Sequence, residues 1–218
     1  MASSSPPARP PTEARLARKR HRQDARRRAI LAAARQLLEV SGVDHFSVER
    51  TAELARLSKP SVYYYFKSKE AIILALSAEA LEAETSALER VLESSAGTVI
   101  GRAVTAFVEH YAARAQSFKT LYFWSEVAGV ARSLVETPVY PRAVSVREKL
   151  ARALEAELGS LGPPARRKAE SFVTLTLAAA RGLIGDSFMR ALSPKEVRSL
   201  AEELVRCLGA GLGAERRE

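Results

Sequence analysis

Three consecutive tyrosines at positions 63–65 lie between basic residues, with Lys59 on one side and Lys67 and Lys69 on the other. Tyrosine hydroxyls and lysine ammonium groups donate hydrogen bonds to phosphate oxygens, and tyrosine rings pack against sugars and base edges. Lys69 also falls in the first turn of a predicted helix, whose backbone N–H groups attract phosphate. These residue types and their spacing favour phosphate binding by a short segment of chain.

The segment 58–66 has the pattern of a short helix with two different faces, and Ser58 is its predicted N-cap. At about 100° per residue, Tyr65 and Phe66 fall within about 60° of Val62, so these three residues share a packing face. The opposite face carries Pro60, Tyr63 and Tyr64. Two tyrosines that face water have no packing role, so this face is predicted to bind a partner. A tyrosine-rich surface that docks onto another protein domain is the alternative, but it leaves the neighbouring lysines without a role.

The elements that must position this helix come before it in the chain. The range 24–40 has helical spacing of apolar residues, and Gly42 is its predicted C-cap. A second helix begins after the N-cap Ser47 and ends near residue 54. Residues 55–57 then form the three-residue link that is expected between two helices crossing at a steep angle. The pattern therefore predicts a helix-turn-helix.

The positive charge of the chain lies almost entirely in its N-terminal third. Residues 1–69 hold 15 Lys or Arg against 6 Asp or Glu, a net of +9, whereas residues 70–218 hold 19 against 19. A basic patch beside a helix-turn-helix is typical of a nucleic-acid-binding protein, although a charge run alone is only a solvated helix face. Residues 1–22 are rich in Ser, Pro and Arg and are predicted to form a disordered basic arm.

Composition excludes several classes of protein. The 218 residues are 47% hydrophobic, enough for a sizeable core, yet no apolar run approaches the roughly 20 residues needed to cross a bilayer. The N-terminus lacks the apolar centre of a secretory signal, and four prolines among the first eleven residues disfavour an amphipathic transit peptide. The single Cys207 fits apolar packing in a reducing compartment. We therefore expect a cytoplasmic protein.

No arrangement of residues predicts catalysis. The three histidines, at positions 21, 45 and 110, show no metal-ligand spacing with each other or with Cys207. The glycines at 209, 211 and 213 follow a predicted helix, whereas a phosphate loop follows a strand. We expect no enzyme activity, no catalytic residues, no bound metal and no cofactor.

The remainder of the chain is predicted to be helical, without a convincing strand, so the fold class is all-α with about nine helices. The predicted helices after the helix-turn-helix cover 69–94, 99–116, 118–134, 141–159, 163–190 and 194–209. The expected organisation is the arm 1–22, a three-helix domain 23–69, a helical bundle 70–213 and a tail 214–218.

The block SKPSVYYYF at 58–66, followed by KSKE and an apolar run, resembles the DNA-binding domain of TetR-family (TetR/AcrR) transcriptional regulators. The resemblance implies that the start of the second helix enters the major groove, that Tyr63 and Tyr64 touch the DNA backbone, and that Ser47 and Lys69 hold phosphates. The predicted DNA-binding residues are Ser47, Ser58, Lys59, Pro60, Ser61, Tyr63, Tyr64, Lys67 and Lys69.

The resemblance also implies a homodimer that represses transcription from a palindromic operator and is released by a small apolar effector. Helices 163–190 and 194–208 are the predicted dimer surface, with ordinary core packing as the alternative. The candidate effector pocket, which fits an ordinary aromatic core equally well, is Phe107, His110, Tyr111, Phe118, Tyr122, Trp124, Phe172 and Phe188. A helical protein-interaction module and a non-specific DNA-coating protein remain the alternative functions.

Two positions depart from the family pattern. Arg56 stands in the turn where the family commonly has Gly, because a left-handed backbone is needed there, and Arg in that geometry costs roughly 1 kcal/mol. Thr51 stands where the family usually has an aliphatic residue facing the core. Either its hydroxyl donates to a backbone carbonyl or the packing around it is looser.

Overall fold

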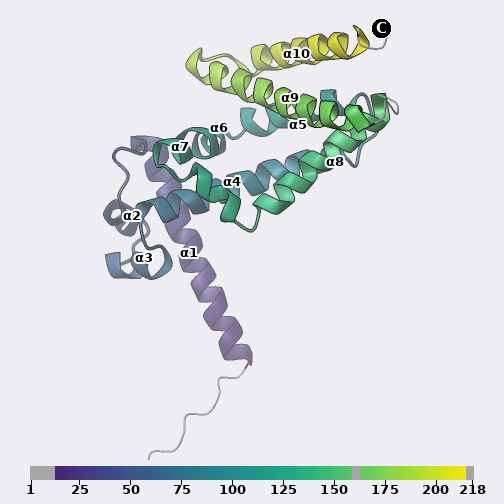
Figure 1. Ribbon diagram of the computed structural model, residues 1–218. Coiled ribbons are helices and arrows are strands. Elements are labelled where there is room, and N and C mark those ends of the chain that lie inside the picture. Colours follow the sequence, from purple (N-terminus) through teal and green to yellow (C-terminus); the bar gives the residue numbers. More distant parts are fainter. Residues whose placement is uncertain (1–12, 159–162, 215–218) are drawn as a thin grey trace, which may run out of the picture. The chain divides into compact units, whose positions relative to one another are not determined.

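The computed structural model describes residues 13–158 and 163–214, and these residues form ten α-helices, two short helical segments of other types and no strand (Figure 1). The all-α prediction is therefore confirmed for the described part of the chain. The chain divides into two compact units, Met1–Ile72 and Ile73–Glu218. No helix within the described ranges is long and apolar enough to cross a membrane.

The first unit contains α1 (Glu13–Ser41), α2 (Val48–Leu54), α3 (Lys59–Tyr65) and the first turn of α4 (Lys69–Val91). Apolar side chains from all of these helices, and from the loop between α1 and α2, form its core. The largest of the buried residues are Ile30, Leu31, Leu38, Phe46, Val62, Phe66 and Ile72. In this unit α2 packs against α1, and α3 packs against α2.

Helix α1 begins at Glu13, not near residue 24, so the predicted disordered arm was wrong for residues 13–22. The rest of that arm, residues 1–12, lies outside the described residues. The segment that follows Pro11 is composed mainly of Ala, Leu, Arg, Lys and Gln, which have high helix propensity, and it contains no proline. Helix α1 ends as predicted, because Gly42 has a positive φ of 68° and its N–H donates to the carbonyl of Leu38 at 3.0 Å.

The turn between α2 and α3 has the left-handed residue that the family pattern implies. Arg56 has a φ of 55°, and the N–H of the next residue, Leu57, donates to the carbonyl of Ala52 at 2.9 Å. This bond across the end of α2 satisfies a carbonyl that the helix leaves free. The turn is therefore formed without glycine, and the strain falls on the backbone of Arg56.

Replacing Arg56 with glycine is expected to raise the free energy of unfolding by about 0.5–1 kcal/mol, because glycine adopts a positive φ without a Cβ clash. Urea denaturation of the whole chain measures the change. Arg56→Ala is the control, since alanine also removes the side chain but keeps the strained backbone. A glycine variant no more stable than the alanine variant would show that the turn is not strained.

Thr51 is fully buried in the first unit, and its hydroxyl donates to the carbonyl of Ser47 at 2.8 Å. The first of the two predicted alternatives is therefore confirmed. The hydrogen bond satisfies the hydroxyl inside the core, so threonine is accommodated in place of an aliphatic residue.

The second unit is a helical bundle in which α5 packs against α8, α9 and α10. Its elements after α4 are α5 (Val99–Ala112), α6 (Ala115–Lys119), the π-helical turn η1 (Thr120–Trp124), α7 (Ser125–Val127), the 3₁₀ segment η2 (Ala131–Glu136), α8 (Tyr140–Leu158), α9 (Pro163–Met189) and α10 (Pro194–Ala214). Buried aliphatic and aromatic residues of α5, α8 and α9, joined by Val197 and Ala201 of α10, form the main core.

The continuous helix predicted for 118–134 was wrong, because the structure divides this range into α6, η1, α7 and η2. The hydroxyl of Thr120 donates to the carbonyl of Gln116, and that of Ser125 donates to Leu121. Such bonds compete with the regular helical ladder and distort it. Gly129, with a φ of 70°, then ends α7.

A capping box begins α10. The N–H of Glu196 donates to the hydroxyl oxygen of Ser193, and the Glu196 carboxylate accepts from the N–H of Ser193 at 2.8 Å. The hydroxyl and N–H of Ser193 hold the pKa of the Glu196 carboxyl below its usual value. The reciprocal bonds fix the start of the helix.

Candidate nucleic-acid interface

Helix α3 has one buried and one exposed face, and the division is the one predicted from the helical angles. Val62 is fully buried and Phe66 is 4% exposed, whereas Tyr64 is 65% exposed and Tyr63 is 37% exposed. Tyr65 is half-buried beside them. The packing face anchors α3 to its unit, so the outward tyrosines are presented by a fixed helix.

Capping and one cation fix the two ends of α3. The hydroxyl of Ser58 accepts the N–H of Ser61 at 3.3 Å, and the two serine hydroxyls lie 2.8 Å apart. At the other end, the N–H of Phe66 donates to Val62, and the guanidinium of Arg27 in α1 lies 5.2 Å from the centre of the Phe66 ring. The predicted DNA-binding serines are thus also the residues that begin the helix.

Lys59, the first residue of α3, is paired with a residue that the sequence analysis did not predict. Its ammonium group contacts the carboxylate of Glu49 in α2 and lies 5.9 Å from the ring centre of Tyr63. The hydrogen bond between the two side chains lowers the pKa of Glu49 and raises that of Lys59. Both side chains are about half exposed, so water or another anion can compete for the pair.

The other predicted residues lie at helix starts around α3. The hydroxyl of Ser47, the N-cap of α2, accepts the N–H of Arg50 at 3.2 Å. Lys67 and Lys69 are exposed, and Lys69 is the first residue of α4, where Ser68 accepts the N–H of Ala71. None of the nine predicted residues is buried, and all nine belong to the first unit.

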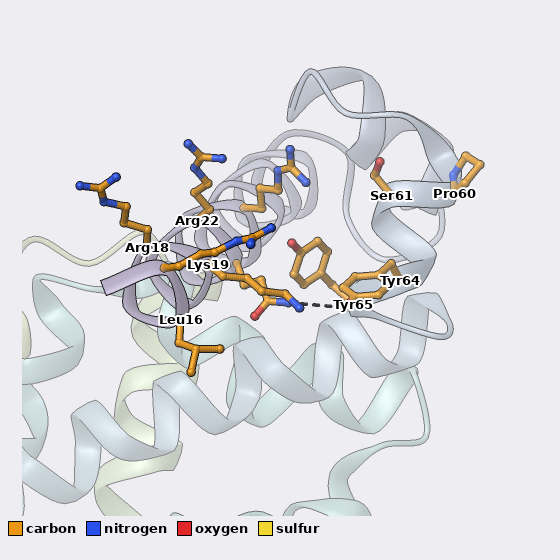
Figure 2. A pocket seen from close by; sticks show the side chains of 11 residues that line it. Leu16, Arg18, Lys19, Arg22, Pro60, Ser61, Tyr64 and Tyr65 are labelled. Carbon is orange, nitrogen blue, oxygen red and sulfur yellow. Dashed lines mark hydrogen bonds between the residues drawn. The ribbon is translucent and has the colours of Figure 1, made fainter. Parts of the chain in front are cut away.

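Helix α1 also contributes to the surface beside α3, which the sequence analysis missed. The side-chain amide of Gln23 donates to the hydroxyl of Tyr64 at 3.4 Å. Figure 2 shows Arg18, Lys19 and Arg22 of α1 beside a groove that is also lined by Tyr64 and Tyr65 of α3. The signal in the sequence was the run of helix-forming residues after Pro11. It was hidden because residues 13–22 were grouped with the proline-rich segment.

In the second unit, six of the eight candidate pocket residues lie together as an aromatic cluster. The rings of Phe107, Tyr111, Phe118 and Tyr122 have neighbouring centres 4.8–6.5 Å apart. Phe188 extends the cluster through Phe118, and His110 extends it through Tyr111. Trp124 and Phe172 make no ring contact with this cluster among the described residues. The cluster is a packed core in this structure.

A buried carboxylate that the sequence analysis missed lies at the edge of the aromatic cluster. Glu84 of α4 is 2% exposed, accepts the hydroxyls of Tyr111 and Tyr122, and has Arg147 of α8 at 3.7 Å. Burial, and then the charge of Glu84, raise the pKa of both tyrosines, so their hydroxyls stay protonated and donate. Nothing in the sequence distinguishes Glu84 from the four other glutamates of α4.

A pair of short helices joined by a tight turn, whose second member presents tyrosines and basic residues to solvent, is typical of a helix-turn-helix DNA-binding domain. The model of the tetR family of bacterial regulatory proteins matches residues 30–76, which contain this pair. Over this segment the chain is similar to that family. It is 39% identical over 71 residues to the HTH-type transcriptional regulator EthR of Mycolicibacterium smegmatis, and that match covers 33% of each chain.

The chain thus spans about a third of the length of such relatives. Solved structures extend the likeness in fold to most of the chain. The fatty acid degradation regulator FadR from Bacillus halodurans has a TM-score of 0.66 at 13% identity, covering 84% of this chain and 94% of that one. A TetR family transcription regulator from Marinobacter aquaeolei VT8 has a TM-score of 0.62 at 17% identity, covering 87% and 97%. These named relatives are transcriptional regulators.

Proposed function

We propose that the protein is a sequence-specific DNA-binding regulator, a repressor that binds a palindromic operator as a homodimer in the bacterial cytoplasm. The observation that carries the proposal is the outward face of α3. Tyr64 is 65% exposed on a helix whose other face is anchored by the fully buried Val62. An exposed tyrosine with lysines on either side suits the sugar-phosphate backbone of DNA.

The proposed contacts follow from the positions of the side chains on the first unit. The start of α3, with Ser58, Lys59, Pro60 and Ser61, would face base edges in the major groove. Tyr63 and Tyr64 would donate to phosphates from the next turn of the same helix. Ser47, Lys67 and Lys69 would hold phosphates from the starts of α2 and α4.

A dimer is proposed because one helix-turn-helix reads only one half-site. Helix α9 carries an exposed stripe of apolar and small residues, Leu175, Ala178, Ala179 and Gly182, which share one face of the helix. Leu200 of α10 is also exposed, at 36%. Small residues allow two helices to approach closely, so this stripe supports dimerisation through α9 and α10.

The proposed effector is a small apolar molecule that binds in the second unit at the aromatic cluster. The supporting observation concerns two polar atoms: the side-chain nitrogen Nε2 of His110 and the hydroxyl of Thr176 are buried and have no hydrogen-bond partner among the described residues. Unsatisfied buried groups are unfavourable, and a ligand that bonds to them removes the penalty. An effector would release DNA if it bound more tightly to a form of the dimer in which the two α3 helices are wrongly spaced for successive major grooves. Binding would then shift the population of dimers toward that form.

Selection of bound duplexes from a random DNA pool tests the proposed function. A regulator is expected to enrich a two-fold symmetric site and to prefer it to random DNA by roughly 10³-fold or more. A DNA-coating protein would bind without that preference, and a protein-docking module would not bind DNA. Either outcome would contradict the proposal.

Replacing Tyr64 with alanine is expected to weaken binding about tenfold, which corresponds to about 1.4 kcal/mol, for the selected site and for random DNA alike. The loss is uniform because a phosphate contact carries no base information. Fluorescence anisotropy with both duplexes measures it. Phe123→Ala is the control, since Phe123 is an aromatic residue of the second unit that is 58% exposed. Unchanged binding by Tyr64→Ala would remove this residue from the interface.

A further inference from the structure

A groove of about 1030 Å³ lies within the first unit, between the N-terminal half of α1 and α3 (Figure 2). One wall is formed by Pro60, Ser61, Tyr64 and Tyr65 of α3. The other wall carries five basic residues of α1, which we name the α1 stripe: Arg15, Arg18, Lys19, Arg22 and Arg26. The matched family region begins at residue 30, so the α1 stripe lies outside it.

The spacing of the α1 stripe places all five cations on one side of the helix. At about 100° per residue, positions 15, 18, 19, 22 and 26 fall within an arc of about 100°. Asp24, an acidic residue in the same part of α1, falls on the opposite side. At about 1.5 Å per residue, the stripe forms a row of positive charge about 16 Å long.

This row of charge has no compensating acid. Within the described ranges, no member of the α1 stripe forms an ion pair, and all five side chains are exposed. Like charges three and four residues apart repel one another and destabilise a helix. A polyanion in the groove would turn this repulsion into attraction, so the surface is complementary to a row of phosphates.

We infer that the α1 stripe binds the phosphate backbone of duplex DNA beside the base pairs that α3 faces. This inference rests on the proposed function, because Tyr64 and Ser61 of the opposite wall belong to the proposed DNA-binding face. A duplex carries one negative charge per about 1.7 Å of its axis, so a row of about 16 Å has more phosphates beside it than it has cations. The stripe adds affinity and salt dependence, and it extends the footprint into flanking DNA.

Two double variants with the same loss of charge test the inference. Arg18→Gln with Arg22→Gln, the groove pair, removes two cations from the groove. The second variant is the matched pair. Arg20→Gln with Arg28→Gln removes two exposed cations from the other side of the same helix, and glutamine retains helix propensity in both pairs. Binding is measured against salt concentration on the selected site, with and without about five base pairs of flanking duplex, a length comparable to the stripe.

The groove pair is expected to weaken binding to the flanked site about tenfold or more and to lower the slope of log K against log salt by about 2, because each phosphate contact contributes about 0.9. The matched pair is expected to have a clearly smaller effect on both quantities. On the site without flanks, the groove pair and the wild type are expected to bind nearly alike. Equal effects of the two pairs, or a loss that is the same with and without flanks, would overturn the inference.

The outcomes separate this inference from the proposed function. If the wild type prefers its selected site but the two pairs behave alike, the α1 stripe is not a contact surface and the proposed function stands. If the wild type shows no preferred site but the groove pair alone weakens binding, the stripe binds DNA and the proposed specific regulation fails. Circular dichroism of both pairs checks that α1 stays helical.

Discussion

Replacing Phe66 with alanine is expected to lower the free energy of unfolding of the first unit by about 3–5 kcal/mol and to abolish DNA binding. Phe66 is 4% exposed, and its N–H donates to Val62 at the end of α3. Alanine would leave a cavity and remove the ring that Arg27 covers. Helix α3 offers few other buried contacts, because Val62 is its only buried residue. The outward tyrosines would therefore lose their fixed position.

Urea denaturation followed by tyrosine fluorescence and far-UV circular dichroism measures the loss of stability, and anisotropy with the selected duplex measures binding. Phe66→Leu is a graded control, because leucine keeps most of the buried volume and should retain binding. The second unit is expected to stay folded in both variants, so most of the helical signal remains. If Phe66→Ala bound DNA as tightly as the wild type, the packing face would not be what positions α3.

Replacing Glu84 with alanine is expected to lower the stability of the second unit by about 3–5 kcal/mol, although a charged residue in a core is usually unfavourable. The carboxylate accepts hydrogen bonds from Tyr111 and Tyr122, and Arg147 lies 3.7 Å away. Alanine would leave two buried hydroxyls without an acceptor, and that desolvation is the source of the loss. Thermal and urea unfolding measure it.

Glu84→Gln is the matched control, because its amide oxygen still accepts from the tyrosines while the charge is removed. We expect a loss of about 1–2 kcal/mol for glutamine, clearly smaller than for alanine. Tyr122→Phe in the alanine background should recover part of the stability, since it removes one of the orphaned hydroxyls. Equal losses for alanine and glutamine would mean that the charge, and not the hydrogen bonding, holds this part of the core.

The structural features that the sequence predicted well are those with local causes. The N-caps Ser47 and Ser58 and the C-cap Gly42 act within four residues, so their effects can be read along the chain. The two faces of α3 follow from helical angles alone. For the same reason the strained turn at Arg56 was predictable once the family pattern was applied.

The features that the sequence did not predict depend on contacts between residues far apart in the chain, or on where the boundary between two segments was drawn. The pairing of Lys59 with Glu49 and the burial of Glu84 arise only when helices pack, and no spacing in the sequence indicates them. The start of α1 was misplaced because composition was averaged over residues 1–22, which joined prolines to strong helix formers. The division of 118–134 follows from hydroxyl groups that bond to the helix backbone.

In the proposed complex with DNA, the ion pair between Lys59 and Glu49 would affect how accurately Lys59 reads a base. When Lys59 leaves Glu49 for an acceptor on a base, the free energy gained is only the difference between the hydrogen bond to the base and the ion pair that is given up. When the base offers no acceptor, Lys59 returns to the carboxylate and is never left desolvated and alone. Mismatches opposite Lys59 are therefore penalised weakly, and the operator position that it faces should vary more than its neighbours.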